Sequence, residues 1–145
     1  MNSKKMDYIT RPATDADYQY CYRLTKRNMF TLITRHWGGW IPSMFRQDFS
    51  VEATTIVIAS GQRMGYYSVK EDEESLYLEN IQLSSSVRGR GIGTAILQSI
   101  FRENASKPIR LTTFTDNPAM RLYERLGFVV TQCEGATVHM IRCTE

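Results

Sequence analysis

The stretch that decides the fold is Val87-Arg88-Gly89-Arg90-Gly91-Ile92-Gly93-Thr94, a glycine-rich basic segment followed by an amphipathic pattern. Its three glycines allow backbone dihedrals and close approaches that a Cβ would block, so successive N–H groups can converge on one anion. Apolar residues then recur at three- and four-residue spacing, which predicts a helix from about Gly91 to Ala105 whose positive N-terminus faces the same anion. The stretch therefore predicts a pyrophosphate-binding loop, with Arg88 and Arg90 as mobile positive charges at its rim. The apolar face of the predicted helix consists of Ile92, Ile96, Leu97, Ile100 and Phe101.

Two commoner phosphate-binding patterns do not fit this stretch. No Lys-Ser or Lys-Thr pair follows the glycines, as a P-loop requires, and Thr94 stands where the dinucleotide fingerprint counted from Gly89 requires Gly or Ala. What remains is the spacing Arg88-x-x-Gly91-x-Gly93. A plain turn that leads into a helix explains the same glycines, because glycine is common in turns of every kind.

Composition limits the class of protein. A chain of 145 residues with 42% apolar content fits one domain, residues 1–145, around a single core. The net charge of +3 is small and the Lys and Arg residues are scattered, which argues against nucleic acid as a partner. No apolar run approaches the roughly twenty residues of a membrane span, and the first residues lack the apolar segment of a signal peptide. We therefore expect a cytoplasmic protein with no membrane partner.

The cysteines and histidines give no metal-binding pattern. Cys21, Cys133 and Cys143 are odd in number and lie within apolar patterns, so we expect reduced, structural thiols. His36 and His139 have no Cys or His neighbour at ligand spacing, and we expect no metal site.

Hydrophobic periodicity and turn residues predict a mixed α+β order of elements. Thr14 and Asp17 form a plausible capping box at the start of the first helix, and Gly127 is a plausible helix stop. The expected elements are a strand at 8–10, a helix from 18 to 24, a second helical stretch at 29–34, a short helix at 42–49, strands at 54–59, 63–70 and 76–83, the helix after the glycine loop, a strand at 108–114, a helix from 117 to 126, and a hairpin of 129–132 with 138–142.

The spacing Arg88-x-x-Gly91-x-Gly93 resembles the acyl-CoA signature Gln/Arg-x-x-Gly-x-Gly/Ala of the GNAT superfamily of N-acyltransferases. A second segment, Asn117-Pro118-Ala119-Met120-Arg121-Leu122-Tyr123-Glu124-Arg125-Leu126-Gly127-Phe128, resembles the family's Asn-x-x-Ala-x-x-Leu-Tyr-x-x-x-Gly-Phe. It departs from that pattern at the alanine, which lies at 119 and is followed by Met120 and Arg121. The predicted order of elements is similar to that of the family over essentially the whole chain. The resemblance implies a single-domain GNAT-like fold, with a mixed and mostly antiparallel sheet flanked by helices.

The same resemblance implies acetyl-CoA as co-substrate and no metal. It places the backbone of Ile81 and Leu83 against the pantetheine arm and the thioester carbonyl, and Asn117 at a side-chain contact with the coenzyme. A helix cap is the alternative role for Asn117. The residues it assigns to the pyrophosphate are Arg88, Gly89, Arg90, Gly91, Ile92, Gly93 and Thr94.

Acyl transfer from a thioester to an amine needs a base, because an amine with a pKa near 10 is mostly protonated at neutral pH. Glu79 lies in Leu78-Glu79-Asn80-Ile81-Gln82-Leu83, which looks like a strand of aminoglycoside and diamine acetyltransferases whose glutamate faces the acceptor, often through water. Strand alternation puts Glu79 on one face with Ile81 and Leu83, which partly desolvates the carboxylate. An ion pair at the sheet is the alternative.

Tyr123 occupies the position that the resemblance assigns to the general acid, a phenol near the coenzyme sulfur. Helix periodicity alone favours a different role, core packing beside Leu122 and Leu126. Both interpretations stay open at this point.

The acceptor is less defined. Trp37 and Trp40 flank two glycines and could form an aromatic wall over an amine by cation–π attraction, or a hydrophobic plug. We predict an N-acetyltransferase that transfers the acetyl group of acetyl-CoA to a primary amine of a small molecule or peptide, by direct attack in a ternary complex. Two alternatives stay open: a non-catalytic acyl-CoA-binding or sensor module, and an interaction domain whose loop holds another anion. A homodimer stays open as well.

Overall fold

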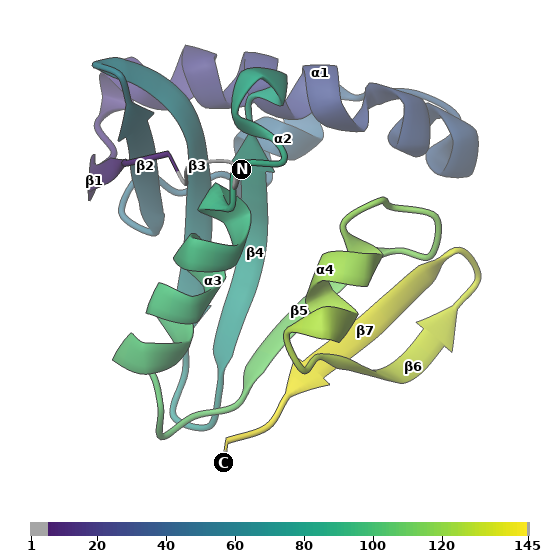
Figure 1. The fold of residues 1–145 in the computed structure, drawn as a ribbon. Coiled ribbons are helices and arrows are strands. Elements are labelled where there is room, and N and C mark those ends of the chain that lie inside the picture. The colour runs from purple at the N-terminus through teal and green to yellow at the C-terminus, as the bar shows by residue number, and fades with distance from the viewer. Residues whose placement is uncertain (1–5, 145) are drawn as a thin grey trace. The chain divides into compact units, whose positions relative to one another are not determined.

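The computed structural model describes residues 6–144 and has an α+β architecture (Figure 1). Its strands are hydrogen-bonded in the order β1-β2-β3-β4-β5-β7-β6, where β4 and β5 run parallel and the pairs β1–β2, β2–β3, β5–β7 and β6–β7 run antiparallel. The predicted mixed and mostly antiparallel sheet is thereby confirmed. The elements are β1 (Ile9–Pro12), η1 (Asp15–Asp17), α1 (Tyr18–Trp37), α2 (Pro42–Asp48), β2 (Thr54–Ala59), β3 (Gln62–Glu71), β4 (Leu76–Leu83), η2 (Ser85–Val87), α3 (Ile92–Glu103), β5 (Ile109–Phe114), α4 (Met120–Arg125), β6 (Val129–Glu134) and β7 (Thr137–Arg142).

The described residues divide into two compact units. The first contains the chain up to Ser68 together with Asn80–Ile92, and the second contains Val69–Glu79 together with the chain from Gly93 onward. Strands β3 and β4 each contribute residues to both units. The prediction of one domain over residues 1–145 stays a prediction.

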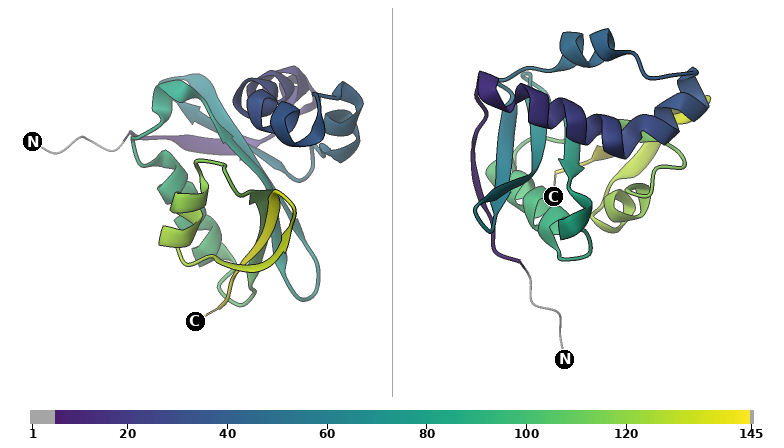
Figure 2. Two further views of the ribbon diagram at one scale, coloured as in Figure 1. Left: turned by 90° about the vertical axis from the view of Figure 1, so that its right-hand side faces the viewer. Right: turned by 90° about the horizontal axis from the view of Figure 1, so that it is seen from above.

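Helix α1 is a single helix of 20 residues, where the sequence predicted two helical stretches. The prediction of a break was wrong because residues 25–28, Thr-Lys-Arg-Asn, contain neither Gly nor Pro, and Gly38 with φ +84° ends the helix instead. The predicted capping box at Thr14 and Asp17 is present and opens η1, which leads into α1. Figure 2 shows α1 as one continuous rod followed by the shorter α2. In the described part of the chain, α1 included, no helix has an apolar stretch long enough to cross a membrane.

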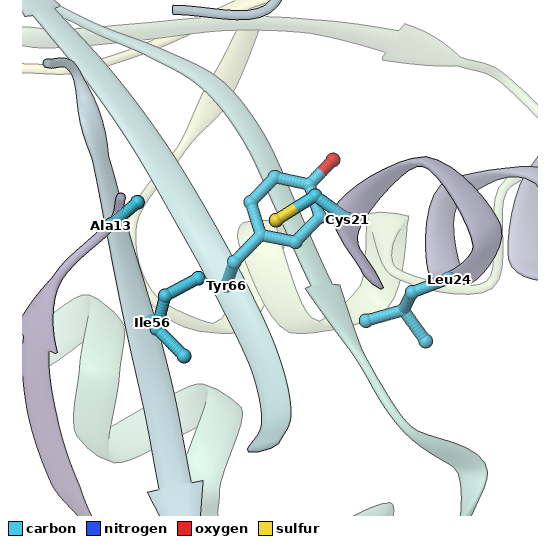
Figure 3. Close-up of a cluster of buried hydrophobic side chains, with 5 residues drawn as sticks. All are labelled: Ala13, Cys21, Leu24, Ile56 and Tyr66. Carbon is cyan, nitrogen blue, oxygen red and sulfur yellow. The ribbon is translucent and has the colours of Figure 1, made fainter. Parts of the chain in front are cut away.

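In the first unit, α1 packs against β2 and β3 through a small buried cluster (Figure 3). Cys21 and Leu24 from the helix meet Ile56 and Tyr66 from the strands, with Ala13 beside them. The buried hydroxyl of Tyr66 forms a hydrogen bond with the Thr25 hydroxyl, so this core leaves that polar group satisfied.

Gly65 fixes the approach of β3 to β4 in the first unit. A Cβ at this buried position would lie 2.5 Å from the carbonyl oxygen of Gln82 and 2.6 Å from Cδ2 of Leu83. Because a backbone atom cannot move away as a side-chain end can, only glycine fits here.

In the second unit, the apolar face predicted for α3 is buried, with Ile96, Leu97, Ile100 and Phe101 each at most 9% exposed. The Phe101 ring contacts Phe128, and Arg142 stacks its guanidinium 3.9 Å from the centre of the Phe101 ring. The Arg142 Nε also donates to the Leu126 carbonyl at the end of α4. These contacts hold α3, α4 and β7 together inside the unit.

The three thiols are free, but their surroundings differ. Cys21 is buried as predicted, whereas Cys133 and Cys143 are exposed. The prediction was wrong for Cys133 because every residue of β6, where it lies, is exposed, so the apolar pattern there covers no core. Within residues 6–144, no group of three or more His, Cys, Asp and Glu side chains is placed to hold a metal ion.

Candidate functional site

The glycine loop has the backbone that an anion-binding turn requires. The 3-10 turn η2 ends at Val87, residues 88–91 form a further turn, and α3 begins at Ile92, as the sequence predicts. Gly89 has φ +76° and Gly91 has φ +80°, the left-handed region in which a side chain is strained. The loop therefore delivers the chain directly to the N-terminus of a 12-residue helix, where N–H donors have no partner within the helix.

The side chains of the loop differ in what they can offer an anion. Arg88, Gly89, Arg90 and Gly91 are exposed, whereas Ile92 is 1% exposed and can present only its backbone. Among residues 6–144, Arg90 has no hydrogen-bond or ion-pair partner. It fits the predicted mobile charge, while Arg88 is held by a neighbour.

That neighbour is Asn28 in α1, which the sequence analysis did not select. Arg88 Nη2 donates to Asn28 Oδ1 at 2.8 Å, and Asn28 Nδ2 donates to the Leu83 carbonyl and to Gln82 Oε1, each at 3.1 Å. Gln82 Nε2 in turn donates to Asn80 Oδ1 at 2.8 Å. The available signal was Gln82, a polar residue alternating with apolar ones in a strand, because a buried carboxamide needs a partner.

The backbone of β4 alternates in direction along the strand. The Ser84 N–H donates to the Met64 carbonyl of β3 at 2.8 Å. Because successive backbone groups point to opposite edges, Gln82 faces β3, and Ile81 and Leu83 face the other edge. The Leu83 carbonyl there already accepts from Asn28. The N–H of Leu83 and both backbone groups of Ile81 have the direction needed to pair with an extended ligand.

In the second unit, the ladder between β4 and β5 comprises Leu76 with Ile109 and Tyr77 with Arg110. Glu79 lies beyond these pairs, with its side chain 22% exposed and Oε2 2.9 Å from Lys70 Nζ. Leu76, Leu78 and Gln82 are buried, whereas Glu79, Ile81 and Leu83 are intermediate, so the more buried face of β4 is the one opposite Glu79. The contact is the ion pair that the alternative interpretation of Glu79 predicted.

Tyr123 in α4 is 7% exposed and packs its ring edge-on against Phe128, with ring centres 5.8 Å apart. Burial raises the pKa of Tyr123 to about 12, because the phenolate is poorly solvated there. The phenol therefore keeps its proton at neutral pH. The phenol has a proton to donate but is a weaker acid than an exposed tyrosine, and its ring contact suits core packing.

The side chain of Asn117 closes the turn that leads into α4 and does not cap the helix itself, because the N-cap position is Ala119. Its Oδ1 accepts from the Ala119 N–H at 2.9 Å, and its Nδ2 donates to Thr113 Oγ1 at 2.9 Å. Its carbonyl also accepts from the Met120 N–H, the first residue of α4. Asn117 thus ties the end of β5 to the start of α4 within the second unit.

The two tryptophans have different surroundings. Trp40 contacts Tyr22 edge-on, and its Nε1 donates to the Tyr22 hydroxyl at 3.0 Å, whereas Trp37 is 56% exposed. Trp40 fits the predicted plug and Trp37 does not. The rings that fasten α2 to α1, here called the α1–α2 aromatic cluster, are Tyr18, Tyr22, Trp40, Phe45 and Phe49.

Comparison with known proteins gives the family. Residues 52–130, more than half of the chain, match the family model described as an acetyltransferase (GNAT) domain. The chain therefore belongs to the GNAT acetyltransferase family, as the two sequence motifs predicted. The mycothiol acetyltransferase of Corynebacterium glutamicum (strain R) is 29% identical over 105 residues, which cover 66% of this chain and 36% of that protein. The chain spans about a third of the length of the curated relatives it matches.

Solved structures agree on the fold. The PaiA N-acetyltransferase of Thermoplasma acidophilum, in complex with coenzyme A, has a TM-score of 0.71 at 16% identity and covers 95% of this chain and 99% of its own. The ribosomal-protein-S18-alanine N-acetyltransferase of Escherichia coli has a TM-score of 0.73 at 17% identity, with 96% and 95% covered. The predicted GNAT-like fold is thereby confirmed.

Proposed function

We propose that this chain is an acetyl-CoA-dependent N-acetyltransferase whose pyrophosphate-binding loop is Arg88–Thr94. The observation that carries the proposal is the pair of left-handed glycines, Gly89 and Gly91, directly before α3 in a GNAT domain. Consecutive backbone N–H groups and a helix N-terminus make a concave donor surface for a diphosphate. Arg90 adds a positive charge at its rim.

The chemical groups that these residues offer suit acetyl-CoA, as does the backbone conformation of the loop. Ile81 and Leu83 offer backbone groups along the edge of β4 that faces away from β3, and an extended amide-containing arm pairs with such an edge as a strand does. The bound co-substrate supplies the acetyl group as a thioester. Ile92 contributes its N–H, since its side chain is in the core.

Glu79 is the proposed base. Its carboxylate already accepts an ammonium group, that of Lys70, so the cationic form of an acceptor amine can take the same kind of contact. Glu79 accepts a proton from the amine, directly or through water, and the nitrogen lone pair then attacks the thioester carbon. A C–N bond forms, the C–S bond breaks, and the second proton that the nitrogen must lose passes to solvent, as does the proton held by Glu79.

Tyr123 is the proposed acid. Its phenol, with a pKa of about 12, is protonated throughout the neutral range and donates that proton to the departing thiolate. The product amide and the free thiol then leave, and Tyr123 regains a proton from solvent.

The proposed acceptor is a primary amine of a small molecule or a peptide. By their names, the mycothiol acetyltransferase and the S18-alanine N-acetyltransferase act on acceptors of different size. The exposed ring of Trp37 supports an aromatic wall that attracts a cation.

A non-catalytic acyl-CoA-binding module is the second candidate. The observations that favour it are the ion pair of Glu79 with Lys70 and the packing of Tyr123 on Phe128, since each side chain has a structural role. Such a module keeps the loop and lacks turnover.

Two measurements separate these functions. First, thermal unfolding is followed with acetyl-CoA, with CoA, and with inorganic pyrophosphate at equal concentration. We expect acetyl-CoA and CoA to raise the Tm by several degrees at about 100 times the Kd, since ligand binding stabilises the folded chain by about 2.7 kcal/mol there. Second, thiol release from acetyl-CoA is measured with a panel of amines and amino-terminal peptides.

Each outcome assigns the function. A Tm rise with thiol release that depends on an amine supports the enzyme. A Tm rise with no thiol release in the presence of any amine supports the acyl-CoA-binding module. A Tm that rises with pyrophosphate but not with CoA supports a loop that binds another anion.

A further inference from the structure

Four polar side chains of the first unit form one directed chain of hydrogen bonds. Arg88 donates to Asn28, Asn28 donates to Gln82, and Gln82 donates to Asn80, over distances of 2.8, 3.1 and 2.8 Å. Each carboxamide in the middle both accepts and donates, so the orientation of every member is fixed by its neighbours. This row of hydrogen bonds runs along the side of β4 that faces α1.

Asn28 lies in the middle of this row of hydrogen bonds and makes one further hydrogen bond. Its Nδ2 also donates to the Leu83 carbonyl at the end of β4, while its Oδ1 accepts from Arg88 in the loop. A single carboxamide on a rigid helix therefore holds two segments that are separated by the 3-10 turn η2. Those segments are the two that the proposed function assigns to acetyl-CoA.

The geometry also gives Arg88 a role other than the predicted one. Its guanidinium is committed to a neutral carboxamide on α1, whereas Arg90 has no partner among the described residues. A guanidinium fixed through a terminal nitrogen loses the mobility that a rim charge needs. The first arginine of the loop signature is then an anchor of the loop, and the second is the charge that meets phosphate.

We infer that Asn28 is a positioning residue for the pyrophosphate loop, and that Asn28 and Arg88 act as one clamp that sets the loop against the end of β4. The inference rests on the proposed function. The clamp acts on CoA affinity through loop geometry, with no contact between the Arg88 side chain and the phosphates.

The test measures the Kd of CoA for the full chain by isothermal titration calorimetry, at low and at high salt. The variants are Asn28→Ala, Arg88→Ala, the double variant and Arg90→Ala. Gln19→Ala is the matched control for Asn28, because Gln19 is an exposed carboxamide on α1. Arg102→Ala is the matched control for Arg88, because it removes one exposed positive charge from the chain. The Tm of each variant without ligand is recorded as well.

We expect Asn28→Ala and Arg88→Ala each to weaken CoA binding by about tenfold, the effect of one lost charge-assisted contact. The Kd of the double variant should exceed that of either single variant by no more than about twofold, because both substitutions remove the same clamp. Salt should weaken binding to Arg88→Ala as steeply as to the unaltered chain, whereas Arg90→Ala should lose part of that dependence. The two controls should bind as the unaltered chain does.

Several results would overturn the inference. Multiplied losses in the double variant, or a flatter salt dependence in Arg88→Ala, would mean that Arg88 meets the phosphates directly. A lower Tm of Asn28→Ala with unchanged CoA affinity would mean that Asn28 only stabilises the fold. If Asn28→Ala does not fold, the salt dependence of Arg88→Ala still decides, since Arg88 is exposed. Absence of CoA binding by the unaltered chain is a distinct result, which overturns the proposed function and this inference with it.

Discussion

At the scale of single residues, the same side chain often carries a structural contact and the chemistry proposed for it. Glu79 is paired with Lys70, Tyr123 packs on Phe128, and Asn117 closes the turn that leads into α4. The sequence predicted two roles for each, a structural role and the role that the resemblance to the family implies. A buried or paired group is also what a catalytic site needs, so the two roles are compatible.

Tyr123→Phe separates the two roles of the tyrosine. It keeps the ring against Phe128 and removes only the hydroxyl, so the free energy of unfolding should change by less than about 1 kcal/mol. The loss of the proton donor should lower kcat about ten- to a thousandfold, with a much smaller change in the KM for acetyl-CoA. Thiol release under conditions where chemistry limits the rate checks this. An unchanged kcat would mean that Tyr123 serves only in core packing.

Glu79→Gln tests the base. If Glu79 removes the amine proton, kcat should fall roughly a hundredfold or more and the acidic limb of the pH–rate profile should flatten, while CoA affinity hardly changes. Lys70→Ala is the companion variant, since it removes the partner of the carboxylate and leaves the base. A profile of Glu79→Gln that keeps its acidic limb would assign the proton to water or to another residue.

Asp17 predicts how stability depends on pH. Its side chain is 2% exposed and accepts two hydrogen bonds from Arg11, at 2.8 and 2.9 Å, one from Arg63 and one from the Thr14 N–H. The Arg11 guanidinium, with Thr14 and Arg63, holds the pKa of Asp17 well below its usual value of about 3.9. Because its pKa is depressed, the ionised Asp17 stabilises the folded chain at pH values above about 3.9. This contribution disappears as the pH falls toward the pKa of the folded state.

Asp17→Asn should therefore lower the free energy of unfolding by about 1 to 3 kcal/mol at pH 7, since it weakens hydrogen bonds to charged donors. The difference from the unaltered chain should shrink as the pH falls below about 4. Urea unfolding at several pH values measures it, with the exposed Asp15→Asn of the same turn as control. A difference that stays constant down to pH 2 would contradict the assignment.

At the scale of elements, the sequence predicted most of the fold because its signals are local. Strands β2 and β4 have the predicted bounds, and α3 begins at Ile92, within one residue of its predicted start. The length of α1 was missed because the apolar spacing is interrupted at residues 25–28, although the absence of Gly and Pro there lets the helix continue to Gly38. The contact of Asn28 with Arg88 was missed because it joins residues 60 positions apart, which no local pattern contains.

Gly65 tests how closely β3 and β4 must approach. A Cβ there would clash with the Gln82 carbonyl oxygen, the Leu83 side chain and, at 3.2 Å, the Leu83 Cα. Gly65→Ala should lower the free energy of unfolding by about 1 to 3 kcal/mol, the usual range for overpacking a core. Gly39→Ala is the control, because a Cβ at Gly39 meets nothing within 4 Å and its φ is not positive. Equal stability of the two variants in urea would mean that the strands can separate without loss.

At the scale of the whole molecule, the family assignment and the predicted sheet agree, and the acceptor amine is the feature that the sequence specifies least. The ring contacts of the α1–α2 aromatic cluster and the exposure of Trp37 are set by tertiary packing. A generic aromatic pattern in the sequence cannot distinguish a plug from a wall.

The central claim is that the loop Arg88–Thr94 binds acetyl-CoA, and calorimetric titration of acetyl-CoA into the unaltered chain and into Gly91→Asp tests it most directly. Gly91 has φ +80°, and an aspartate there brings both strain and a negative charge to the place where backbone donors meet the pyrophosphate. Gly135→Asp is the matched control, a left-handed glycine with φ +60° in the turn between β6 and β7 with open space around its Cβ position. We predict binding to the unaltered chain and to Gly135→Asp, and none to Gly91→Asp. Binding of equal affinity by Gly91→Asp, or none by the unaltered chain, would contradict the claim.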